Sequence, residues 1–187
     1  MELAEAIYGR RATRAFASQP VAKAVLERLV DAAIQAPTAV NQQPWDFAIV
    51  RGQARLKQIA QTAKQHMSNI IESELQHHFR SDLGDPDFDI FYHAPVLIVI
   101  SAKVGEWAIE DASLAAENLM LTAHALGLGS CWIGFAQRWL ETDEGRSSIR
   151  LPSNFLPVAP IILGYPAKQM PAVPRKPPVV RWINGDQ

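Results

Sequence analysis

The stretch that decides the fold is Ala36-Pro37-Thr38-Ala39-Val40-Asn41-Gln42-Gln43-Pro44-Trp45-Asp46-Phe47-Ala48-Ile49-Val50. Its polar, proline-bounded middle separates an amphipathic segment from an apolar run, a pattern that predicts a helix, a structured loop and a strand. Pro37 ends the helix and Pro44 keeps Gln43 out of the helical region, so residues 37–44 are expected to be extended.

The three neighbouring amides of this loop, Asn41, Gln42 and Gln43, offer uncharged donors and acceptors. Such groups suit the edge of a heterocycle better than a metal or a phosphate, which would favour charged partners. In the alternative interpretation the amides cap the helix end and Trp45 belongs to the core.

Outward from this loop, hydrophobic periodicity predicts the remaining elements. Helices are expected at residues 3–10, with Leu3 and Ile7 inward, and at residues 20–37, 53–79 and 141–149. Strands are expected at residues 46–50, buried, at 95–101, central in the sheet, and at 158–163. Because Pro160 lacks an amide N–H, the last strand is expected to place it at an edge or at its start.

Residues 107–126 predict a long helix that is apolar around much of its circumference. Such a helix must be buried on more than one side, either within one chain or between two. Residues 127–134, Gly-Leu-Gly-Ser-Cys-Trp-Ile-Gly, end it with a glycine and turn into a short strand. They do not fit the dinucleotide-binding fingerprint, because they follow a helix and Trp132 stands where the third glycine should be.

Length and composition indicate one soluble globular domain over residues 1–187. The chain is 48% hydrophobic, 20% charged and has a net charge of -1, so no global field attracts nucleic acid or an anionic membrane. No apolar run is long enough to span a membrane, the start is not a signal peptide, and Cys131 is the only cysteine. A cytoplasmic protein is expected, with Cys131 a small buried residue and not a nucleophile.

Basic residues gather near both ends of the chain. Arg10, Arg11 and Arg14 form one group, which could be a solvated basic turn or could surround an anion. The second is an acid-free run from Gly145 to Arg181, whose last part, 167–187, is predicted to be an extended proline-rich arm. The histidines of residues 66–93 lack metal-ligand spacing, so no metal site is expected, and the apolar groups of residues 88–92 are candidates for a lid over a pocket.

Taken together, the motifs resemble the nitroreductase family of flavin enzymes, in family order and over nearly the whole chain. The matching segments are Arg10-Arg11-x-x-Arg14-x-Phe16, the loop from Ala36 to Phe47, the turn from Gly127 to Gly134, Leu163-Gly164-Tyr165-Pro166 and Pro174-Arg175-Lys176-Pro177. The resemblance implies an α+β fold with a mostly antiparallel sheet covered by helices. It also implies a homodimer, with the helix 107–126 at the interface.

The resemblance further implies one FMN at each of two sites built from both chains. Arg10, Arg11 and Arg14 would hold the phosphate, ribityl and pyrimidine side, and Arg175 and Lys176 the phosphate. The residues that would reach the flavin of the partner chain are Pro37, Thr38, Ala39 and Asn41, those beside the isoalloxazine are Trp132, Ile133 and Gly134, and Gln65 or Asn69 is a further candidate. Ala12 stands where many relatives have serine, which removes one phosphate contact.

The expected activity is hydride transfer from NADH or NADPH through FMN to a nitroaromatic, quinone or related acceptor, in ping-pong fashion. No catalytic side chain is required, because the flavin carries the redox chemistry. Substrate choice is expected to lie in residues 66–93. The alternatives are a relative with dehydrogenase, dehalogenase or flavin-fragmenting activity, or a non-catalytic module that binds a polyanion through the basic C-terminal run.

Overall fold

A four-stranded antiparallel sheet organises the part of the chain that the computed structural model describes, residues 1–71 and 83–183. Its strands are β1 (Trp45–Arg51), β2 (Val96–Lys103), β3 (Gly129–Trp132) and β4 (Phe155–Gly164), in the spatial order β1-β2-β4-β3. The helices are α1 (Leu3–Gly9), α2 (Lys23–Ala33), α3 (Gln53–Ile71), α5 (Ala108–Ala125), α6 (Gly134–Leu140) and α7 (Asp143–Ser148), with the 3₁₀ turn η1 (Ala39–Asn41). The α+β fold implied by the sequence is confirmed.

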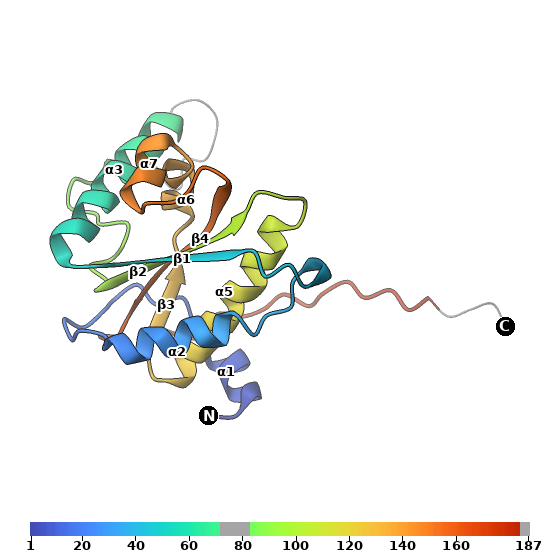
Figure 1. Cartoon of the computed structure of the whole chain (residues 1–187). Helices are drawn as coiled ribbons and strands as arrows, with labels where there is room; N and C mark the ends of the chain where they lie inside the picture. Colours follow the sequence, from blue (N-terminus) through green and yellow to red (C-terminus); the bar gives the residue numbers. More distant parts are fainter. Residues whose placement is uncertain (72–82, 184–187) are drawn as a thin grey trace.

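Helices cover both faces of the sheet (Figure 1). On one face α2 and α5 pack against alternate residues of β2, such as Ile98 and Ile100. On the other face α3 and α6 pack against the residues between them, such as Leu97 and Val99. Because both faces are buried, β2 is a continuous apolar run, as the sequence predicted for a central strand.

The strand β1 differs from the prediction, because it is an edge strand and only half-buried. Its Ile49 side chain is 38% exposed. An apolar run of this length has the same composition in a central strand and in an edge strand with one uncovered side, so the sequence could not separate the two.

Pro160 also departs from the prediction, because it lies inside the central strand β4, opposite Val99 of β2. Its carbonyl accepts a hydrogen bond from Ile133 N at 2.8 Å, on the side of β3. The N and C=O of one strand residue point to the same side, and β3 ends at Trp132. The proline nitrogen therefore faces Ile133, just beyond the end of β3, so the missing donor falls at the margin of the ladder.

The long helix α5 packs on α2 and on β2, β3 and β4, with its alanine-rich side fully buried. Its outer side carries Ile109, 57% exposed, and Leu114, 46% exposed. The short helix α1 contacts α5 and buries Ala6, whereas Leu3 and Ile7, predicted to point inward, are exposed. One chain therefore leaves apolar side chains on both helices uncovered.

Residues 168–183 form no helix or strand and run away from the body as an extended arm (Figure 1). Trp182 and Ile183 near its end are 85% and 92% exposed. The predicted continuation of α3 to Phe79 lies outside the described residues. Among the residues that are described, no helix is long and apolar enough to cross a membrane.

Candidate functional site

The first group of predicted site residues lies on a segment that runs along the free edge of β3. Ala12 pairs in parallel with Ser130, and Thr13 N donates to Ser130 O at 2.9 Å. Farther along, Ala17 N donates to Tyr165 O at 2.8 Å. These hydrogen bonds fix the backbone that carries Arg10, Arg11 and Arg14.

Thr13 locks this segment against the sheet. Its side chain, only 4% exposed, occupies the space where a Cβ on Gly129 would lie, so only glycine fits at that position. Successive side chains of an extended segment point to opposite sides, and Arg14 is accordingly exposed. The Thr13 hydroxyl therefore cannot replace the one that Ala12 lacks.

The C-terminal half of α5 holds the other end of the segment. Glu117 Oε1 lies 3.8 Å from Arg10 Nε, and the His124 ring packs so closely on Gly9 that a Cβ there would be 2.8 Å from Nε2. Arg11 Nη1 donates to Tyr8 O at 2.6 Å. Burial, together with the positive charges of Arg10 and Arg11, lowers the pKa of His124 from its ordinary value.

The glycine-rich turn lies beside these arginines. Cys131 is buried in β3, and its burial raises the pKa of the thiol, an effect that the nearby charges of Arg14 and Arg10 partly oppose. Trp132 is half-buried at the strand end, Ile133 is buried, and Gly134 is exposed as the first residue of α6. The structure thus brings the arginine segment and the residues 132–134 to one edge of the sheet.

The proline-amide loop lies elsewhere, at the N-terminal end of α5 (Figure 1). It is a tight turn and not the extended segment that was predicted, because Gln43 N donates to Thr38 Oγ1 at 3.0 Å and closes it. Val40, Asn41 and Gln43 have φ values of 43°, 55° and 49°. A left-handed conformation is rare for a β-branched residue such as Val40, and strained backbone of this kind clusters at functional sites.

Asp111 anchors the loop to α5. Its Oδ1 accepts a hydrogen bond from Ala39 N at 2.9 Å, and its carbonyl accepts one from Trp45 Nε1 at 3.3 Å. The side chain of Asp111 is buried, so its carboxylate is shielded from solvent and interacts with the loop. Val40 is 87% exposed at the tip, which leaves the loop pointing out from the body.

The two groups are far apart within one chain. Asp111 and His124, which mark them, are thirteen residues apart on α5, and at a rise of 1.5 Å per residue this corresponds to about 20 Å. The structure therefore brings Arg10, Arg11 and Arg14 to the turn 132–134, but it does not bring Pro37, Thr38, Ala39 or Asn41 to them.

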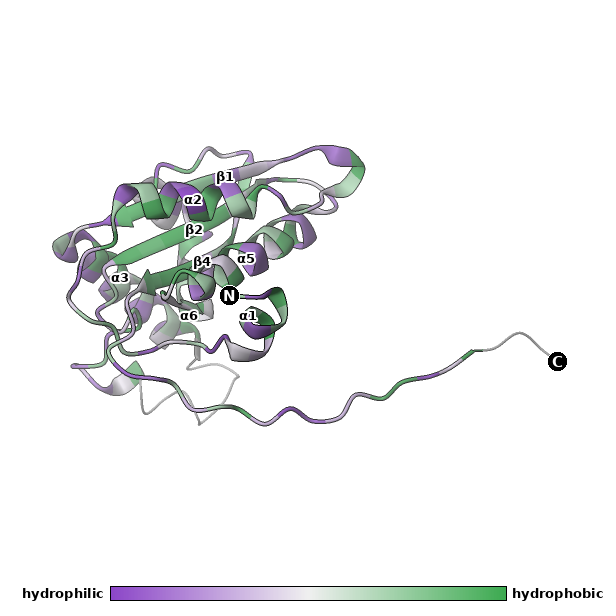
Figure 2. Cartoon of the chain, turned by 90° about the horizontal axis from the view of Figure 1, so that it is seen from below, coloured by the Kyte–Doolittle hydropathy of each residue, from purple (hydrophilic) through white to green (hydrophobic). Residues whose placement is uncertain are grey.

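The basic tail is separated from both groups. Arg175 and Lys176 lie exposed on the arm, which extends away from the body in both views (Figures 1 and 2). Gln65 and Asn69 are exposed on the last two turns of α3. No group of three or more His, Cys, Asp or Glu side chains that could hold a metal is found among the described residues.

Sequence reasoning missed three residues that position the predicted site: Asp111, Glu117 and His124. Each is a polar residue on a helix whose sequence pattern indicated only the apolar positions. The signal for Asp111 was available, because an acid in the apolar face of a helix needs a buried partner. For Glu117 and His124 no signal was available, since their partners are more than 100 residues away in the sequence.

Comparison with known proteins agrees with the family resemblance seen in the sequence. The family model described as "Nitroreductase family" matches residues 7–165. A "NADH dehydrogenase" of Thermus thermophilus is 28% identical, with 86% of this chain and 84% of the relative covered. A "Nitrobenzene nitroreductase" of Ectopseudomonas oleovorans is also 28% identical, with 88% and 87% covered. The crystal structure of a nitroreductase with bound FMN from Bacteroides fragilis superposes with a TM-score of 0.85 at 24% identity, covering 98% of this chain and 100% of that one.

Proposed function

Since the chain belongs to the nitroreductase family, we propose that it is an FMN-dependent oxidoreductase that takes hydride from NADH or NADPH and reduces a nitroaromatic, quinone or related acceptor in ping-pong fashion. The observation that carries the proposal is the group of three arginines held beside the turn 132–134. Two of the relatives are named for NADH dehydrogenation and for nitrobenzene reduction, which agrees with a pyridine nucleotide donor and a small acceptor.

The arginine segment fits the phosphate of FMN. Arg10 and Arg14 supply guanidinium forks, Arg11 keeps Nη2 for an anion while its Nη1 donates to Tyr8 O, and a charge-assisted hydrogen bond contributes roughly 1.5–3 kcal/mol. Ala12 has no hydroxyl and that of Thr13 is buried against Gly129, so the arginines would have to hold the phosphate without one. The Glu117 carboxylate pairs with Nε of Arg10, at 3.8 Å, which leaves the two Nη groups of that guanidinium for an anion.

The residues 132–134 would flank the ring system. Trp132 offers its half-buried apolar indole to the flavin ring. Gly134 is exposed and has no Cβ, so the flavin ring can approach the backbone closely there. When bound, FMN would supply the redox chemistry, so no side chain has to act as a nucleophile. Arg14 would place positive charge near the pyrimidine side and thereby favour the reduced cofactor.

We infer that the complete site needs two chains. Pro37, Thr38, Ala39 and Asn41 lie at the far end of α5 from the arginines of the same chain, about 20 Å away, so they would contact the flavin of a partner chain. The uncovered apolar side chains of α1 and α5, among them Ile7 and Ile109, are the candidate interface. The basic arm, with Arg175 and Lys176, would fold back onto a phosphate only when the cofactor is present.

The polyanion-binding alternative has less support. Arg146, the first cation of the acid-free run, turns inward and donates from Nη2 to the carbonyl oxygens of Pro152, Ser153 and Phe155 at 2.6–2.8 Å. The run therefore does not present a continuous cationic surface, and the arm adds isolated charges.

The absorbance spectrum of the purified protein tests the proposal. We expect an oxidised-flavin spectrum that is bleached by NADH or NADPH under anaerobic conditions and restored by an added quinone or nitroaromatic. Colourless protein that takes up no added FMN, but binds nucleic acid with a steep salt dependence, would overturn the proposal in favour of the binding module.

A further inference from the structure

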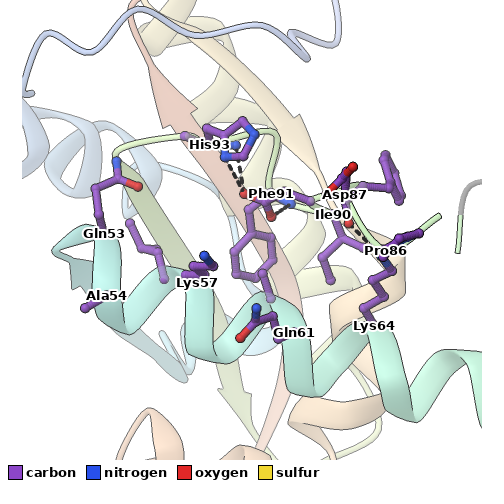
Figure 3. Close-up of a pocket in the computed structure, with 15 residues that line it drawn as sticks. Gln53, Ala54, Lys57, Gln61, Lys64, Pro86, Asp87, Ile90, Phe91 and His93 are labelled. Carbon is purple, nitrogen blue, oxygen red and sulfur yellow. Dashed lines mark hydrogen bonds and ion pairs between the residues drawn. The ribbon is translucent and has the colours of Figure 1, made fainter.

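Two histidines of the described chain lie in opposite electrostatic surroundings. His93 lines a hollow between α3 and the segment 86–94, where its Nδ1 lies 3.1 Å from Asp89 Oδ2 (Figure 3). His124, in the last turn of α5, has the arginine segment as its neighbour. A histidine beside cations takes up a proton less readily, unless an anion joins the group.

The hollow of Figure 3 carries charges of both signs, so its electrostatics select no ligand. Its lining includes two basic and two acidic side chains, Lys57, Lys64, Asp87 and Asp89. Lys64 Nζ also donates to the carbonyl oxygens of Asp85 and Phe88. The segment 88–92, a candidate lid in the sequence, is anchored in the core by Phe91, which is 1% exposed. The surroundings of His124 are not balanced in this way.

The ring of His124 points at the backbone that carries the arginines. A Cβ on Gly9 would lie 2.8 Å from Nε2 but 3.7 Å from Cδ2 and Cε1, so Nε2 is the ring atom nearest to this backbone. The ring is half-buried, and neither of its nitrogens has a hydrogen-bond or ionic partner in the described part of the chain. The ring is therefore free to accept a proton.

Arg10 and Arg11 meet His124 at this backbone. Arg11 Nη1 donates to Tyr8 O at 2.6 Å and to Arg10 O at 2.8 Å, which folds its guanidinium back onto residues 8–10. Arg10 Nε lies 3.8 Å from Glu117 Oε1. Glu117 and His124 are seven residues apart, about two turns, and so share one face of α5. The imidazole and the two guanidinium groups thus form one cluster between the arginine segment and α5.

Positive charge predominates in this cluster. Its acid, Glu117, is paired with Arg10, and Cys131 of the neighbouring strand β3 is uncharged, because burial raises the pKa of its thiol. On α5 itself, Glu110 and Asp111 lie at the opposite end. The titratable side chains of α1, α2 and β2, which pack on α5, are exposed and screened by solvent: Glu2, Glu5, Tyr8, Lys23, Glu27, Arg28, Asp31 and Lys103.

An anion at the arginines would reverse the field at His124. In the free protein burial, together with the charges of Arg10 and Arg11, lowers the pKa of His124. A phosphate monoester has a charge near -2 at pH 7, and an opposite charge nearby favours the protonated imidazole. Linkage is reciprocal, so a protonated ring must in turn strengthen phosphate binding by the same free energy.

We propose that His124 is a protonatable member of the anion site at Arg10 and Arg11, and that it takes up a proton when the phosphate of FMN binds. One proton moves from the solvent to the neutral ring, which then carries N–H on both nitrogens, and no other bond forms or breaks. FMN is held more tightly as the pH falls. The inference rests on the proposed function, because it requires the phosphate of FMN at these arginines.

The sign of the pH dependence follows from this linkage. The contribution of His124 to FMN affinity is fully present below its pKa in the free protein, where the ring is charged before FMN binds. It is lost as the pH rises through the higher pKa of the complex. At pH 8 we expect a neutral ring with and without FMN, and therefore no contribution.

NMR of the full-length protein with ¹⁵N-labelled histidine rings tests the proposal directly. The spectra are recorded from pH 5.5 to pH 8, with and without FMN, and His124→Gln and His93→Gln assign the two signals. Near pH 6.5 we expect FMN to move the His124 signal toward its protonated position and to leave the His93 signal unchanged. The ring itself must be observed, because the phosphate of FMN also exchanges a proton near pH 6.

FMN affinity at pH 5.5 and at pH 8 provides an independent measure. His124→Gln should bind FMN about fivefold more weakly than wild type at pH 5.5, the size of one interaction between partly solvated charges, and equally at pH 8. His93→Gln should match wild type at both values. Comparison at a fixed pH cancels the protonation of the phosphate. Thermal melts at pH 8 check that both variants are folded, and the wild-type spectra test the proposal without either.

Two results would overturn the proposal: a His124 signal that titrates at the same pH with and without FMN, or equal FMN affinity of His124→Gln and wild type at pH 5.5. An equal loss in His93→Gln would also count against it, because the effect would then not come from the arginine cluster. Each of these results requires bound FMN and leaves the proposed function intact. Protein that takes up no FMN at any pH would overturn both.

Discussion

The two ends of α5 hold their functional segments in different ways. At the C-terminal end the arginine segment is bound along its length, by the edge of β3, by Thr13 against Gly129 and by His124 against Gly9. At the N-terminal end the proline-amide loop has left-handed residues, an exposed tip and two hydrogen bonds to one residue, Asp111. The C-terminal end, which we call the anchored end, is preorganised within its own chain. The N-terminal end, which we call the suspended end, projects outward, as a group does that contacts another molecule.

The largest effect is expected from separating the chains, because the contrast between the two ends of α5 implies that the loop of one chain completes the arginine end of another. Ile109→Arg or Leu114→Arg, on the exposed side of α5, should produce monomers that lose most of their FMN. FMN fluorescence, quenched when bound, should be followed against protein concentration beside sedimentation of the same samples. By linkage, added FMN should in turn shift wild-type protein toward dimer.

The control for this experiment is Glu144→Arg, at an exposed position of α7. Ala116 would be an unsuitable position, because it is fully buried in its own chain and an arginine there would test folding. A well-folded monomer that holds FMN as tightly as the dimer would contradict the shared site.

The next effect concerns the anchored end alone. Arg14→Ala should weaken FMN binding by about 1.5–3 kcal/mol, roughly tenfold to more than a hundredfold, and should slow reduction of the flavin that remains. Titration of apoprotein with FMN and stopped-flow reduction by NADH measure the two effects. Arg28→Ala, on the exposed side of α2, is the matched control. Equal affinity and equal reduction rate in Arg14→Ala would remove this residue from the site.

The suspended end can be released without touching the arginines. Asp111→Ala leaves Ala39 N without its acceptor, and we expect a loss of about 1–3 kcal/mol in the free energy of unfolding together with weaker FMN binding. Asp111→Asn keeps an acceptor oxygen and should recover much of both. Urea unfolding and FMN titration of the two variants provide the measurement. Full FMN affinity in Asp111→Ala would show that the cofactor does not need an ordered loop.

The sequence predicted the anchored end better than the suspended one. Gly129 and the arginines are local motifs, and β2 and α5 have clear periodicity, so the main elements followed from the pattern of apolar residues. The conformation of Val40 could not be predicted, because β-branched residues disfavour a left-handed backbone and only tertiary contacts impose it. Pro160 was misplaced for a similar reason, since its tolerance depends on where β3 ends, 28 residues earlier.

Removal of the arm should have a smaller effect. The cut must follow Ala167, because Tyr165 O and Ala167 N form hydrogen bonds with Ala17 and Ala15. Loss of Arg175 and Lys176, both exposed, should weaken FMN binding by about 1 kcal/mol, roughly fivefold, with little change in melting temperature. Equilibrium dialysis of FMN against the truncated and full-length proteins measures it. Unchanged affinity would give the arm a purely structural role.

The smallest effect is a pH dependence at the anchored end. The pKa of His124 is lowered from 6.5 in the folded protein, so below pH 6.5 the unfolded chain takes up a proton that the folded chain does not. The contribution of His124 to the free energy of unfolding is therefore fully present above pH 6.5 and is lost as the pH falls toward the lowered pKa. Thermal melts at pH 8 and pH 5.5 should show a smaller difference in His124→Gln than in wild type, and Arg10→Gln should reduce it in part. Identical pH profiles in all three proteins would contradict the assignment.

The pairing of residues 12–17 with Ser130 and Tyr165 also sets an order of events during synthesis. The segment that carries the three arginines leaves the ribosome before its backbone partners, which are more than a hundred residues downstream. Contacts of such separation form late, because the intervening chain must first be made and folded. A nascent chain would therefore be unable to capture cofactor until β4 has emerged, so saturation with cofactor marks a chain in which the two distant segments have met.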